Sequence, residues 1–314
     1  MTSHASIHTI FGAGQVGTRL AAHLGASGLE VRLVRRSAPG PAIHGVTWMR
    51  GDITDAAFAD RACRGASVVY NCANPADYSR WRGVLEPLYR AVWQAAGRAR
   101  ARVVQLDNLY MYGRPPRAPF DESTPEAPIR DKGRLRHELG CELLDMHARG
   151  EVEAVIGRAS DFFGPKAPNT VVTRDEVLQA ILAGGTAYVF GQPDQPHGYT
   201  YIPDVVSSLA ILGAHPDAPG RVWFLPTSAK LSTRALLERF AEAAGTRVRV
   251  RGIPSWMLKM VGVFSPLMRA LGEMAYQWEM PYVLDDSAFC RTFGASATPL
   301  DQAIDATLAE VRAA

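Results

Sequence analysis

The chain has 314 residues, of which 47% are hydrophobic and 21% charged, and its formal net charge is +3 at pH 7. That length is enough for one large domain or two modest ones with a sizeable buried core. The composition is ordinary for a globular protein, and the arginines are scattered rather than gathered into a basic stripe. The charge therefore argues against a nucleic-acid-binding protein.

The four cysteines, Cys63, Cys72, Cys141 and Cys290, lie far apart and form no Cys-x-x-Cys pair. This spacing argues against a zinc site or a disulfide framework and suits a reducing compartment. The most membrane-like stretch, Trp256–Tyr282, is interrupted by charged residues and proline, whereas a spanning helix needs roughly 18 uninterrupted apolar residues. We expect a cytoplasmic protein with a small-molecule partner, no metal, no nucleic acid and no membrane partner.

Short apolar runs alternate with helical segments through the first half of the chain. The runs predicted as strands are Ile7–Phe11, Val31–Val34, Thr47–Met49, Val68–Asn71, Val103–Leu106 and Ala154–Ile156. The predicted helices between them are Val16–Ala26, Asp55–Cys63, Val84–Arg98 and Arg134–His147. Continuous apolar strands suit a sheet buried on both faces, and strict alternation predicts right-handed βαβ units. The predicted fold class is α/β, with a doubly wound parallel Rossmann sheet.

After Gly157, prolines and glycines interrupt this alternation. The segments predicted here are helices near Arg174–Leu182, after Asp204, at Thr233–Ala244 and at Trp256–Leu271, and a strand at Val222–Leu225. We assign residues 1–160 to a dinucleotide-binding Rossmann core, with returns near 200–228 and 285–297. Residues 161–199 and 229–284 are assigned to a smaller substrate-binding lobe interwoven with that core.

A glycine-rich loop follows the first strand and opens the first helix. Its first glycine allows a tight turn, its second lets a pyrophosphate approach the backbone, and its third lets the helix pack closely on the strand. The N–H groups and positive dipole end of the helix then favour a phosphate. A bare glycine pattern is a weak signal, but this position in the chain predicts a nucleotide cofactor. The predicted phosphate-binding residues are Gly12, Gly14, Gln15, Val16 and Gly17.

The second strand ends in Arg35, Arg36 and Ser37, at the position where NAD-preferring folds place Asp or Glu. A carboxylate would repel a 2′-phosphate, whereas guanidinium and hydroxyl groups bind one through charge-assisted hydrogen bonds. Two solvated arginines on a loop are the alternative interpretation. We expect NADP as the cofactor in preference to NAD.

Two further segments fit the same cofactor. Asp52 and Ile53 follow the third strand, where the Asp52 carboxylate can accept a hydrogen bond from the adenine amino group. The fourth strand ends in Asn71, Cys72 and Ala73, whose small side chains leave space for the adenine ribose. Either segment alone could be ordinary strand-end chemistry, but their order along the chain supports a dinucleotide site.

These segments, together with Met111-Tyr112-Gly113, Arg158–Pro165 and Tyr201–Val205, resemble the extended short-chain dehydrogenase/reductase family, often labelled NAD-dependent epimerase/dehydratase. The resemblance covers nearly the whole chain. It implies reversible hydride transfer between a nicotinamide and a carbon bearing oxygen, in a small carbonyl or hydroxyl compound. It also places Asp161, Phe162 and Phe163 on the nicotinamide and substrate side.

The chain departs from the family's pattern at the catalytic residues. The position of the family's Ser or Thr on the fifth strand is Asn108, which can donate a hydrogen bond to a substrate oxygen. The family's Tyr-x-x-x-Lys is absent, and the best frame puts Lys132 in the Tyr place and Arg136 in the Lys place. The chain therefore resembles an atypical branch without the usual tyrosine acid.

Several residues could replace that acid. Lys132 could hold the nicotinamide ribose or protonate a substrate oxygen, and Arg136, one helical turn on, would suit an anionic substrate or a cofactor phosphate. Tyr110 and Tyr112 are alternative proton donors, and His197 could act as an acid or a substrate hydrogen-bond donor. Each also has a structural interpretation, as a packed tyrosine, a solvated lysine or a core histidine.

The Met- and aromatic-rich segment from Trp256 to Trp278 could form a wall for an apolar substrate, pack the small lobe or make a homodimer contact. Two functions remain open at this point. One is an NADP-linked oxidoreductase or epimerase-like enzyme with a non-standard catalytic set. The other is a catalytically silent NAD(P)-binding sensor of the same fold, which the missing Tyr-x-x-x-Lys favours.

Overall fold

The computed structural model describes residues 6–75, 77–167 and 170–312, and the chain divides into two compact units. Unit 1 consists of Met1–Asp107, Leu135–Arg158 and Val205–Trp223, and unit 2 of Asn108–Arg134, Ala159–Asp204 and Phe224–Ala314. The chain therefore passes between the units after residues 107, 134, 158, 204 and 223. This division differs from the sequence-based domain assignment, because residues 108–134 and 285–297 fall in unit 2.

The fold class expected from the sequence is confirmed by a seven-stranded sheet in the order β10-β6-β5-β4-β1-β2-β3. The strands are β1 Ile7–Phe11, β2 Glu30–Arg35, β3 Val46–Arg50, β4 Ala66–Asn71, β5 Arg102–Asp107, β6 Ala154–Arg158 and β10 Val222–Phe224. β1 pairs in parallel with β2 on one side and with β4 on the other. Strand order reverses there, and in such sheets ligands bind beyond the carboxyl ends of the strands that flank the reversal.

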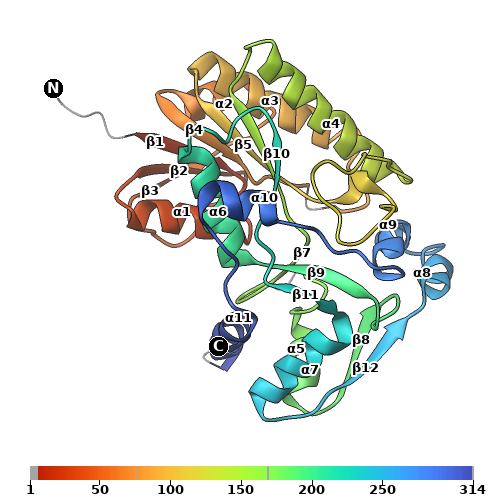
Figure 1. Cartoon of the computed structure of the whole chain (residues 1–314). Coiled ribbons are helices and arrows are strands. Elements are labelled where there is room, and N and C mark those ends of the chain that lie inside the picture. The colour runs from red at the N-terminus through yellow and green to blue at the C-terminus, as the bar shows by residue number, and fades with distance from the viewer. Residues whose placement is uncertain (1–5, 76, 168–169, 313–314) are drawn as a thin grey trace. The chain divides into compact units, whose positions relative to one another are not determined.

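Helices cover both faces of this sheet. They are α1 Gly17–Ala26, α2 Ala56–Cys63, α3 Leu85–Ala99, α4 Asp131–Ala148 and α6 Ile202–Ala214. Figure 1 shows α2, α3 and α4 on one side of the sheet and α1 and α6 on the other. Right-handed crossovers produce this arrangement, because the chain moves outward from β1 to β3 and then returns across the sheet to β4. The strands between the helices are buried as expected, with Ile10, Leu33 and Val104 fully covered.

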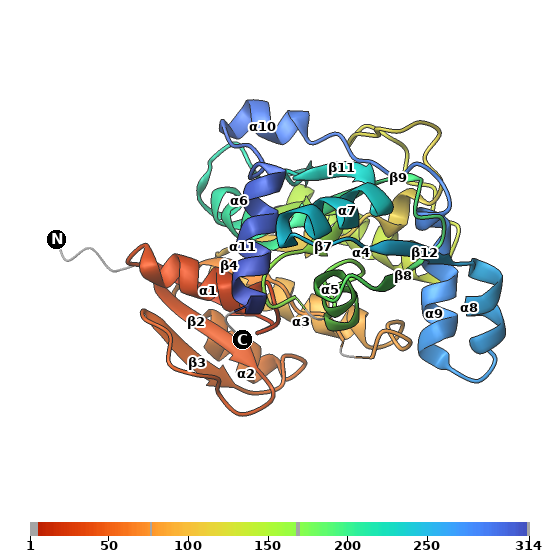
Figure 2. The ribbon, with the colours of Figure 1, turned by 90° about the horizontal axis from the view of Figure 1, so that it is seen from below.

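Unit 2 contains two small sheets, one of three strands in the order β11-β9-β7 and one of two parallel strands, β12 and β8. The strands are β7 Asp161–Phe163, β8 Thr186–Phe190, β9 Pro196–Tyr201, β11 Ala229–Ser232 and β12 Arg249–Ile253. The helical segments are η1 Tyr110–Tyr112, α5 Asp175–Leu182, α7 Thr233–Ala244, η2 Ala275–Trp278, α10 Ser287–Phe293 and α11 Leu300–Arg312. Figure 2 shows α7 and α11 side by side, and both helices contribute to the core that also buries Phe163 and Tyr199.

The segment predicted as one helix over Trp256–Leu271 is instead a hairpin of two helices, α8 Ser255–Val261 and α9 Pro266–Met274. Proline lacks the N–H needed to continue α8 but is well suited to the first turn of α9, where Ser265 Oγ accepts a hydrogen bond from the Met268 N–H at 3.4 Å. The inner face of the hairpin packs through Leu258 against Ala275 and Trp278.

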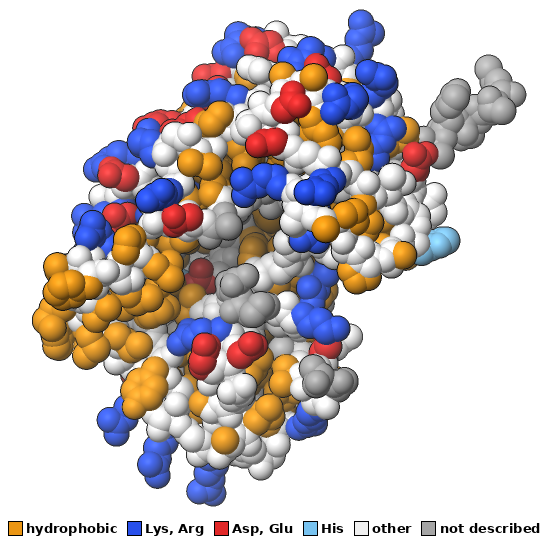
Figure 3. Space-filling model, turned by 180° about the vertical axis from the view of Figure 1, so that it is seen from behind, with side chains coloured by type: hydrophobic (Ala, Val, Ile, Leu, Met, Phe, Trp, Pro, Cys, Tyr) orange, Lys and Arg blue, Asp and Glu red, His pale blue; other side chains and the backbone are white. Residues whose placement is uncertain are grey.

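The outer face of this hairpin is apolar and exposed. We call its exposed large hydrophobic side chains the apolar tip; they are Trp256, Met257, Met260, Val261, Val263, Phe264 and Leu267. Figure 3 shows hydrophobic side chains gathered at the left edge of the view, the side on which α8 and α9 lie after the half-turn from Figure 1. In the described part of the chain, no helix combines the length and the apolar character needed to cross a bilayer.

Candidate cofactor and catalytic site

The three glycines of the loop after β1 have three different steric surroundings. Gly12 has φ +100°, and a Cβ there would lie 2.6 Å from the Ala73 backbone. A Cβ on Gly17 would lie 1.9 Å from the Gly12 carbonyl oxygen, so α1 packs on the loop at a distance only glycine permits. Around Gly14, by contrast, no atom of the described residues would lie within 4 Å of a Cβ. The loop is therefore tight at both ends and open in the middle.

The open middle of the loop has polar groups available to a ligand. α1 begins directly after Val16 with no side-chain cap and no acidic residue in its first turn, so its positive dipole end has no competing carboxylate there. The buried Gln15 Oε1 accepts no hydrogen bond from the described residues. An uncapped helix start beside an open glycine fits a pyrophosphate, and these residues fit a dinucleotide cofactor.

The strand next to β1 ends in a group of cationic side chains. Arg35 Nε donates to Ser37 Oγ at 2.7 Å, and the Arg35 guanidinium lies over the Trp48 ring, 5.6 Å from its centroid. Arg50 stands opposite Arg35 in the β2–β3 pairing, and its Nε donates to the Arg36 carbonyl at 3.3 Å. These contacts hold the Arg35 and Arg50 side chains and the Ser37 hydroxyl at the carboxyl ends of β2 and β3, beside the backbone of Arg36.

Asp52 is held as an ionised acceptor just beyond β3. Its Oδ1 accepts from the Thr54 N–H at 2.9 Å and from Thr54 Oγ1 at 2.8 Å, and these hydrogen bonds lower the pKa of the carboxyl group. The second carboxylate oxygen is the one that suits an adenine amino group. The neighbouring Ile53 is buried and forms part of the packing below it.

The side chains at the end of β4 are bound or packed within the protein, and they fix the backbone that lies beside the glycine loop. The buried Asn71 donates from Nδ2 to Gln105 Oε1 at 2.9 Å and accepts the Ala73 N–H at Oδ1, 3.2 Å away. This fixes Ala73 against Gly12. Burial raises the pKa of the Cys72 thiol to about 12, so this side chain is a neutral packing group at physiological pH.

Arg136 lies in a buried cluster of unit 1, with only 4% of its surface exposed. Its Nη1 donates to Tyr89 Oη at 2.6 Å and to Asp107 Oδ1 at 3.1 Å, and its Nη2 donates to Asn74 Oδ1 at 2.8 Å. Arg158 Nε lies 3.5 Å from the other oxygen of Asp107. The Arg136 guanidinium is thus bound by protein groups at the end of β5, and its contact with an anionic ligand stays a prediction.

The strand-end residues after β5 differ in what they can offer a substrate. Asn108 Oδ1 accepts the Tyr110 N–H at 3.1 Å, which leaves the amide NH₂ as the group that can donate to a substrate oxygen. Tyr110 is partly exposed, and its carbonyl accepts from Tyr276 Oη at 3.3 Å. Tyr112 is buried against the rings of Phe120 and Phe224, a packing position that does not suit a proton donor to a ligand.

Lys132 is buried at the start of α4 and is paired with a residue that the sequence did not indicate. Its Nζ lies 3.2 Å from Oε2 of Glu273 on α9, with the lysine side chain 8% and the glutamate side chain 35% exposed. The two residues are 141 positions apart and carry no shared motif. The pair combines a covered ammonium with a carboxylate that reaches solvent.

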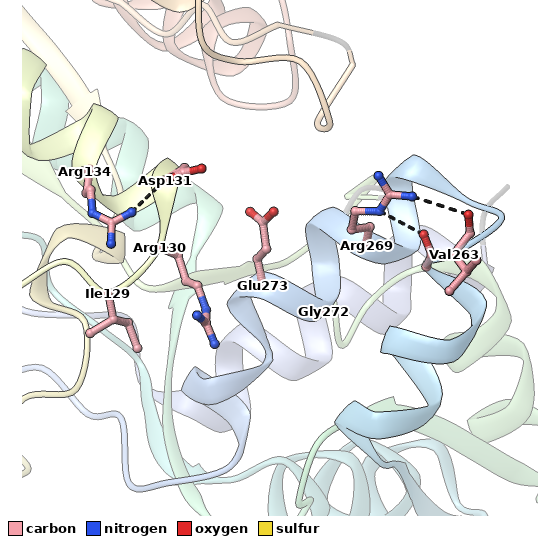
Figure 4. Close-up of a pocket in the computed structure, with 9 residues that line it drawn as sticks. Ile129, Arg130, Asp131, Arg134, Val263, Arg269, Gly272 and Glu273 are labelled. Carbon is pink, nitrogen blue, oxygen red and sulfur yellow. Dashed lines mark hydrogen bonds and ion pairs between the residues drawn. The ribbon is translucent and has the colours of Figure 1, made fainter.

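Glu273 also lines a cavity of about 520 Å³ within unit 2. Figure 4 shows the glutamate projecting into the space between the start of α4 and the α8–α9 hairpin. Three arginines line the same cavity: Arg130, Arg134 and Arg269. Arg134 pairs with Asp131 at 2.6 Å, and Arg269 donates to the Gly262 and Val263 carbonyls. The charged lining therefore consists of three arginines and two carboxylates, those of Asp131 and Glu273.

The residues expected on the substrate side serve mostly as internal supports of unit 2. His197 is buried, with Nε2 3.0 Å from Asp161 Oδ2 and Nδ1 3.2 Å from the Gln277 carbonyl oxygen. Trp278 Nε1 donates to the same Asp161 oxygen at 2.8 Å. Phe163 is fully buried in the core, whereas Phe162 is partly exposed. Both ring nitrogens of His197 thus face protein oxygens, and its role as a substrate donor stays a prediction.

The structure groups the remaining candidates within each unit. Unit 1 gathers the glycine loop, the Arg35–Ser37 pair, Asp52 and the end of β4 at one edge of its sheet. Unit 2 carries Asn108, Tyr110 and the Lys132–Glu273 pair. No group of three or more His, Cys, Asp or Glu residues placed to hold a metal ion is found among the described residues.

Comparison with known proteins agrees with this geometry. The model of the NAD dependent epimerase/dehydratase family matches residues 9–224. The dTDP-6-deoxy-L-talose 4-dehydrogenase (NAD(P)(+)) of Kitasatospora kifunensis is 25% identical over 269 residues, which cover 81% of this chain and 84% of the relative.

Solved structures with similar folds span the whole chain. MoeE5 in complex with UDP-glucuronic acid and NAD matches with a TM-score of 0.78 and 21% identity, covering 98% of this chain and 99% of that one. Bordetella bronchiseptica WbmH in complex with NAD+ matches with a TM-score of 0.73 and 17% identity over 98% and 99% of the two chains. These identities show the shared fold, and the family match covers more than half of the sequence. The chain therefore belongs to the NAD-dependent epimerase/dehydratase family.

Proposed function

We propose that this protein is an NADP-linked oxidoreductase or epimerase that acts on a hydroxyl or carbonyl carbon of a nucleoside-diphosphate sugar. The observation that carries the proposal is the open Gly14 between two tightly packed glycines, one strand away from the Arg35–Ser37 pair. When bound, NADP supplies or accepts a hydride. The protein's own residues have to hold the cofactor's phosphates and manage the proton that accompanies hydride transfer.

NADP preference rests on the charges beyond β2 and β3. Arg35, Arg36 and Arg50 supply three guanidinium groups where an NAD-preferring site would carry a carboxylate. The 2′-phosphate would replace the solvent around these arginines with charge-assisted hydrogen bonds, each of which contributes roughly 1.5–3 kcal/mol. NAD lacks that phosphate and gains none of these bonds.

Lys132 is the residue we assign to proton transfer. Its Nζ is covered and lies against Glu273, so the lysine can hold a proton at a fixed position and exchange it with the solvent-reaching carboxylate. The Asn108 amide NH₂ would orient the substrate oxygen. Tyr110 stays a second proton-donor candidate because it is partly exposed.

The sugar-nucleotide part of the proposal has two supports. The similar MoeE5 structure contains UDP-glucuronic acid, and the Kitasatospora relative is named as a dTDP-sugar dehydrogenase. Within unit 2, a cavity of about 520 Å³ brings together the side chains of Arg130, Arg134 and Arg269, and we assign the diphosphate to these arginines.

A cofactor-binding sensor without catalysis is the second candidate. It is favoured by the absence of Tyr-x-x-x-Lys and by Arg136, whose guanidinium is bound to Asp107, Tyr89 and Asn74 in place of the usual lysine. A sensor would need the phosphate loop of unit 1 but no proton-handling pair in unit 2.

The experiment that separates the two candidates is incubation of the purified protein with NADP or NADPH and a panel of UDP- and dTDP-sugars. Reduced nicotinamide is followed by absorbance and sugar products by chromatography, because an epimerase returns its hydride. We expect turnover that falls by about 10²-fold or more in Lys132→Met and is unchanged in Lys166→Met, an exposed lysine. Tight NADPH binding without any product would favour the sensor.

A further inference from the structure

The apolar tip of the α8–α9 hairpin gathers most of the exposed large hydrophobic side chains in the described part of the chain. Seven large hydrophobic side chains are exposed within the twelve residues from Trp256 to Leu267, and Phe264 at the turn is 92% exposed. Single exposed hydrophobic residues need no explanation, but a contiguous group marks an interaction site. Because Leu258 anchors the opposite face of the hairpin, the tip cannot turn inward without losing its own core contacts.

The backbone of the turn is bonded within the hairpin itself. The N–H groups of Gly262, Val263 and Phe264 donate to the carbonyls of Leu258, Met260 and Val261. Arg269 Nε donates to the Gly262 carbonyl at 3.0 Å and its Nη2 to the Val263 carbonyl at 3.4 Å. These bonds meet a condition for entry into an apolar phase, where a turn must satisfy its backbone groups internally.

The sequence around the tip is mostly basic. Residues 243–272 contain five Lys or Arg residues and no Asp or Glu, and Glu273 follows on α9, where it lines the same cavity as Val263 of the tip. Arg249 and Arg251 alternate with inward residues on β12, so both are exposed on the same face of the strand that leads through Pro254 into α8. An apolar tip bordered by basic residues is complementary to a surface that is apolar inside and negatively charged at its rim.

We propose that the apolar tip docks this protein onto the surface of an anionic phospholipid bilayer, with Phe264 and its neighbours entering the interface and the arginines facing the headgroups. Trp256, half exposed on α8, is of the residue type enriched at that depth. This replaces the sequence-based expectation of no membrane partner. A twofold contact between two copies suits the surface less well, because it would bring the same unbalanced positive charge together from both sides.

The test is co-sedimentation of the full-length protein with large vesicles of phosphatidylcholine alone or mixed with phosphatidylglycerol, at low and high salt. We expect binding to the mixed vesicles that weakens with salt, because the basic residues contribute attraction that ions screen. Phe264→Ser should lower the partition coefficient roughly tenfold or more, since one buried aromatic side chain is removed from the apolar phase. Arg251→Gln should weaken binding to mixed vesicles at low salt and lose that effect at high salt.

Val84→Ser is the matched control, because Val84 is an exposed hydrophobic residue that precedes α3 in unit 1, outside both the hairpin and β12. Its binding to vesicles should equal that of the unchanged protein. The proposal is overturned if the unchanged protein does not sediment with anionic vesicles. It is also overturned if the Phe264→Ser variant binds these vesicles as well as the unchanged protein does. A concentration-dependent dimer that is lost in Phe264→Ser, without vesicle binding, would also overturn it and assign the tip to a second copy.

Discussion

At the scale of single residues, two arginines of unit 1 differ in how their charge is balanced. Arg35 stands at the surface, with Ser37 as its hydrogen-bond partner and an aromatic ring beneath it. Arg136 is buried, and its charge is balanced by Asp107, which also lies beside Arg158. We propose that the first arginine receives an anion, whereas the second supports the end of β5 through its contacts with Asp107. Different measurements should therefore respond to changing them.

Arg35→Asp is expected to reverse the cofactor preference. Removing a guanidinium and placing a carboxylate beside the 2′-phosphate should raise the Kd for NADPH by roughly 10–100-fold, the equivalent of one charged hydrogen bond. The Kd for NADH should stay the same or fall, because NADH carries a ribose 2′-hydroxyl at this position, from which the new carboxylate can accept a hydrogen bond. Fluorescence titration with both cofactors measures the effect, and Arg291→Asp on α10 is a control with the same change of charge. Equal losses for NADH and NADPH would refute NADP recognition by Arg35.

Asp107→Ala is expected to destabilise the fold rather than the cofactor complex alone. It leaves the buried Arg136 and Arg158 without their shared carboxylate, and breaking a buried ion pair costs about 3–5 kcal/mol. Urea unfolding followed by circular dichroism gives the free energy. Glu142→Ala removes the carboxylate of an ion pair with Arg90 that is largely solvent-accessible, and should cost about 1 kcal/mol or less. Equal costs for the two variants would show that burial of the Asp107 cluster adds nothing.

At the scale of elements, the loop between β1 and α1 contains glycines with different roles. Within six residues, one glycine should affect mainly cofactor affinity, and another should also affect the stability of the fold. Gly14→Ala should leave the stability of the cofactor-free protein within about 0.5 kcal/mol, because its Cβ meets no described atom within 4 Å. The same Cβ lies where a pyrophosphate would approach, so NADPH affinity should fall about tenfold or more. Gly17→Ala should lower both quantities, with a stability loss of about 1–3 kcal/mol, because its Cβ would collide with the Gly12 carbonyl. Thermal unfolding with and without NADPH distinguishes the two patterns.

Elements with a strong local pattern could be predicted from the sequence, and those without one could not. β1 has the predicted bounds, and α1 begins one residue later than predicted, because a continuous apolar run and a glycine loop are local signals. β9 was missed because it begins with Pro196 and contains Gly198, residues that usually mark loops. The break between α8 and α9 depends on the Ser265–Pro266 cap, which a helical apolar pattern concealed.

The candidate site shows the same limit. The residues around the phosphate loop are contiguous or regularly placed after strands, so the sequence indicates them. Glu273 lies beside Lys132 only because the chain folds back over 141 positions, and no spacing rule connects a residue on α9 to the start of α4. Likewise, Arg136 occupies the family's lysine position, but its burial against Tyr89 and Asp107 depends on two other elements.

At the scale of the whole molecule, neither unit is a continuous piece of chain. Unit 1 requires Val205–Trp223, a segment that follows its other parts by nearly fifty residues. This segment buries Leu209 and Leu212 of α6, and Arg102 at the start of β5 donates to the carbonyls of Leu212, Gly213 and His215. A Cβ on Gly213 would lie 2.2 Å from the Tyr70 hydroxyl oxygen, so α6 lies tightly on β4. Without this segment, the part of the sheet face that α6 covers would be exposed.

The fragment 1–160, which ends at the sequence-based domain boundary, should therefore fail to fold. It retains the phosphate loop and six of the seven strands of the sheet but lacks α6 and β10. We expect no cooperative thermal transition by circular dichroism and no NADPH binding, because fully buried leucines contribute about 1.5–3 kcal/mol each to a fold that is only marginally stable. Joining residues 202–228 to the fragment through a flexible Gly/Ser linker should restore both properties, since the α6 face is then covered again. If the bare fragment already unfolds cooperatively and binds NADPH, the cofactor site is an independent domain and the return of the chain to unit 1 is dispensable.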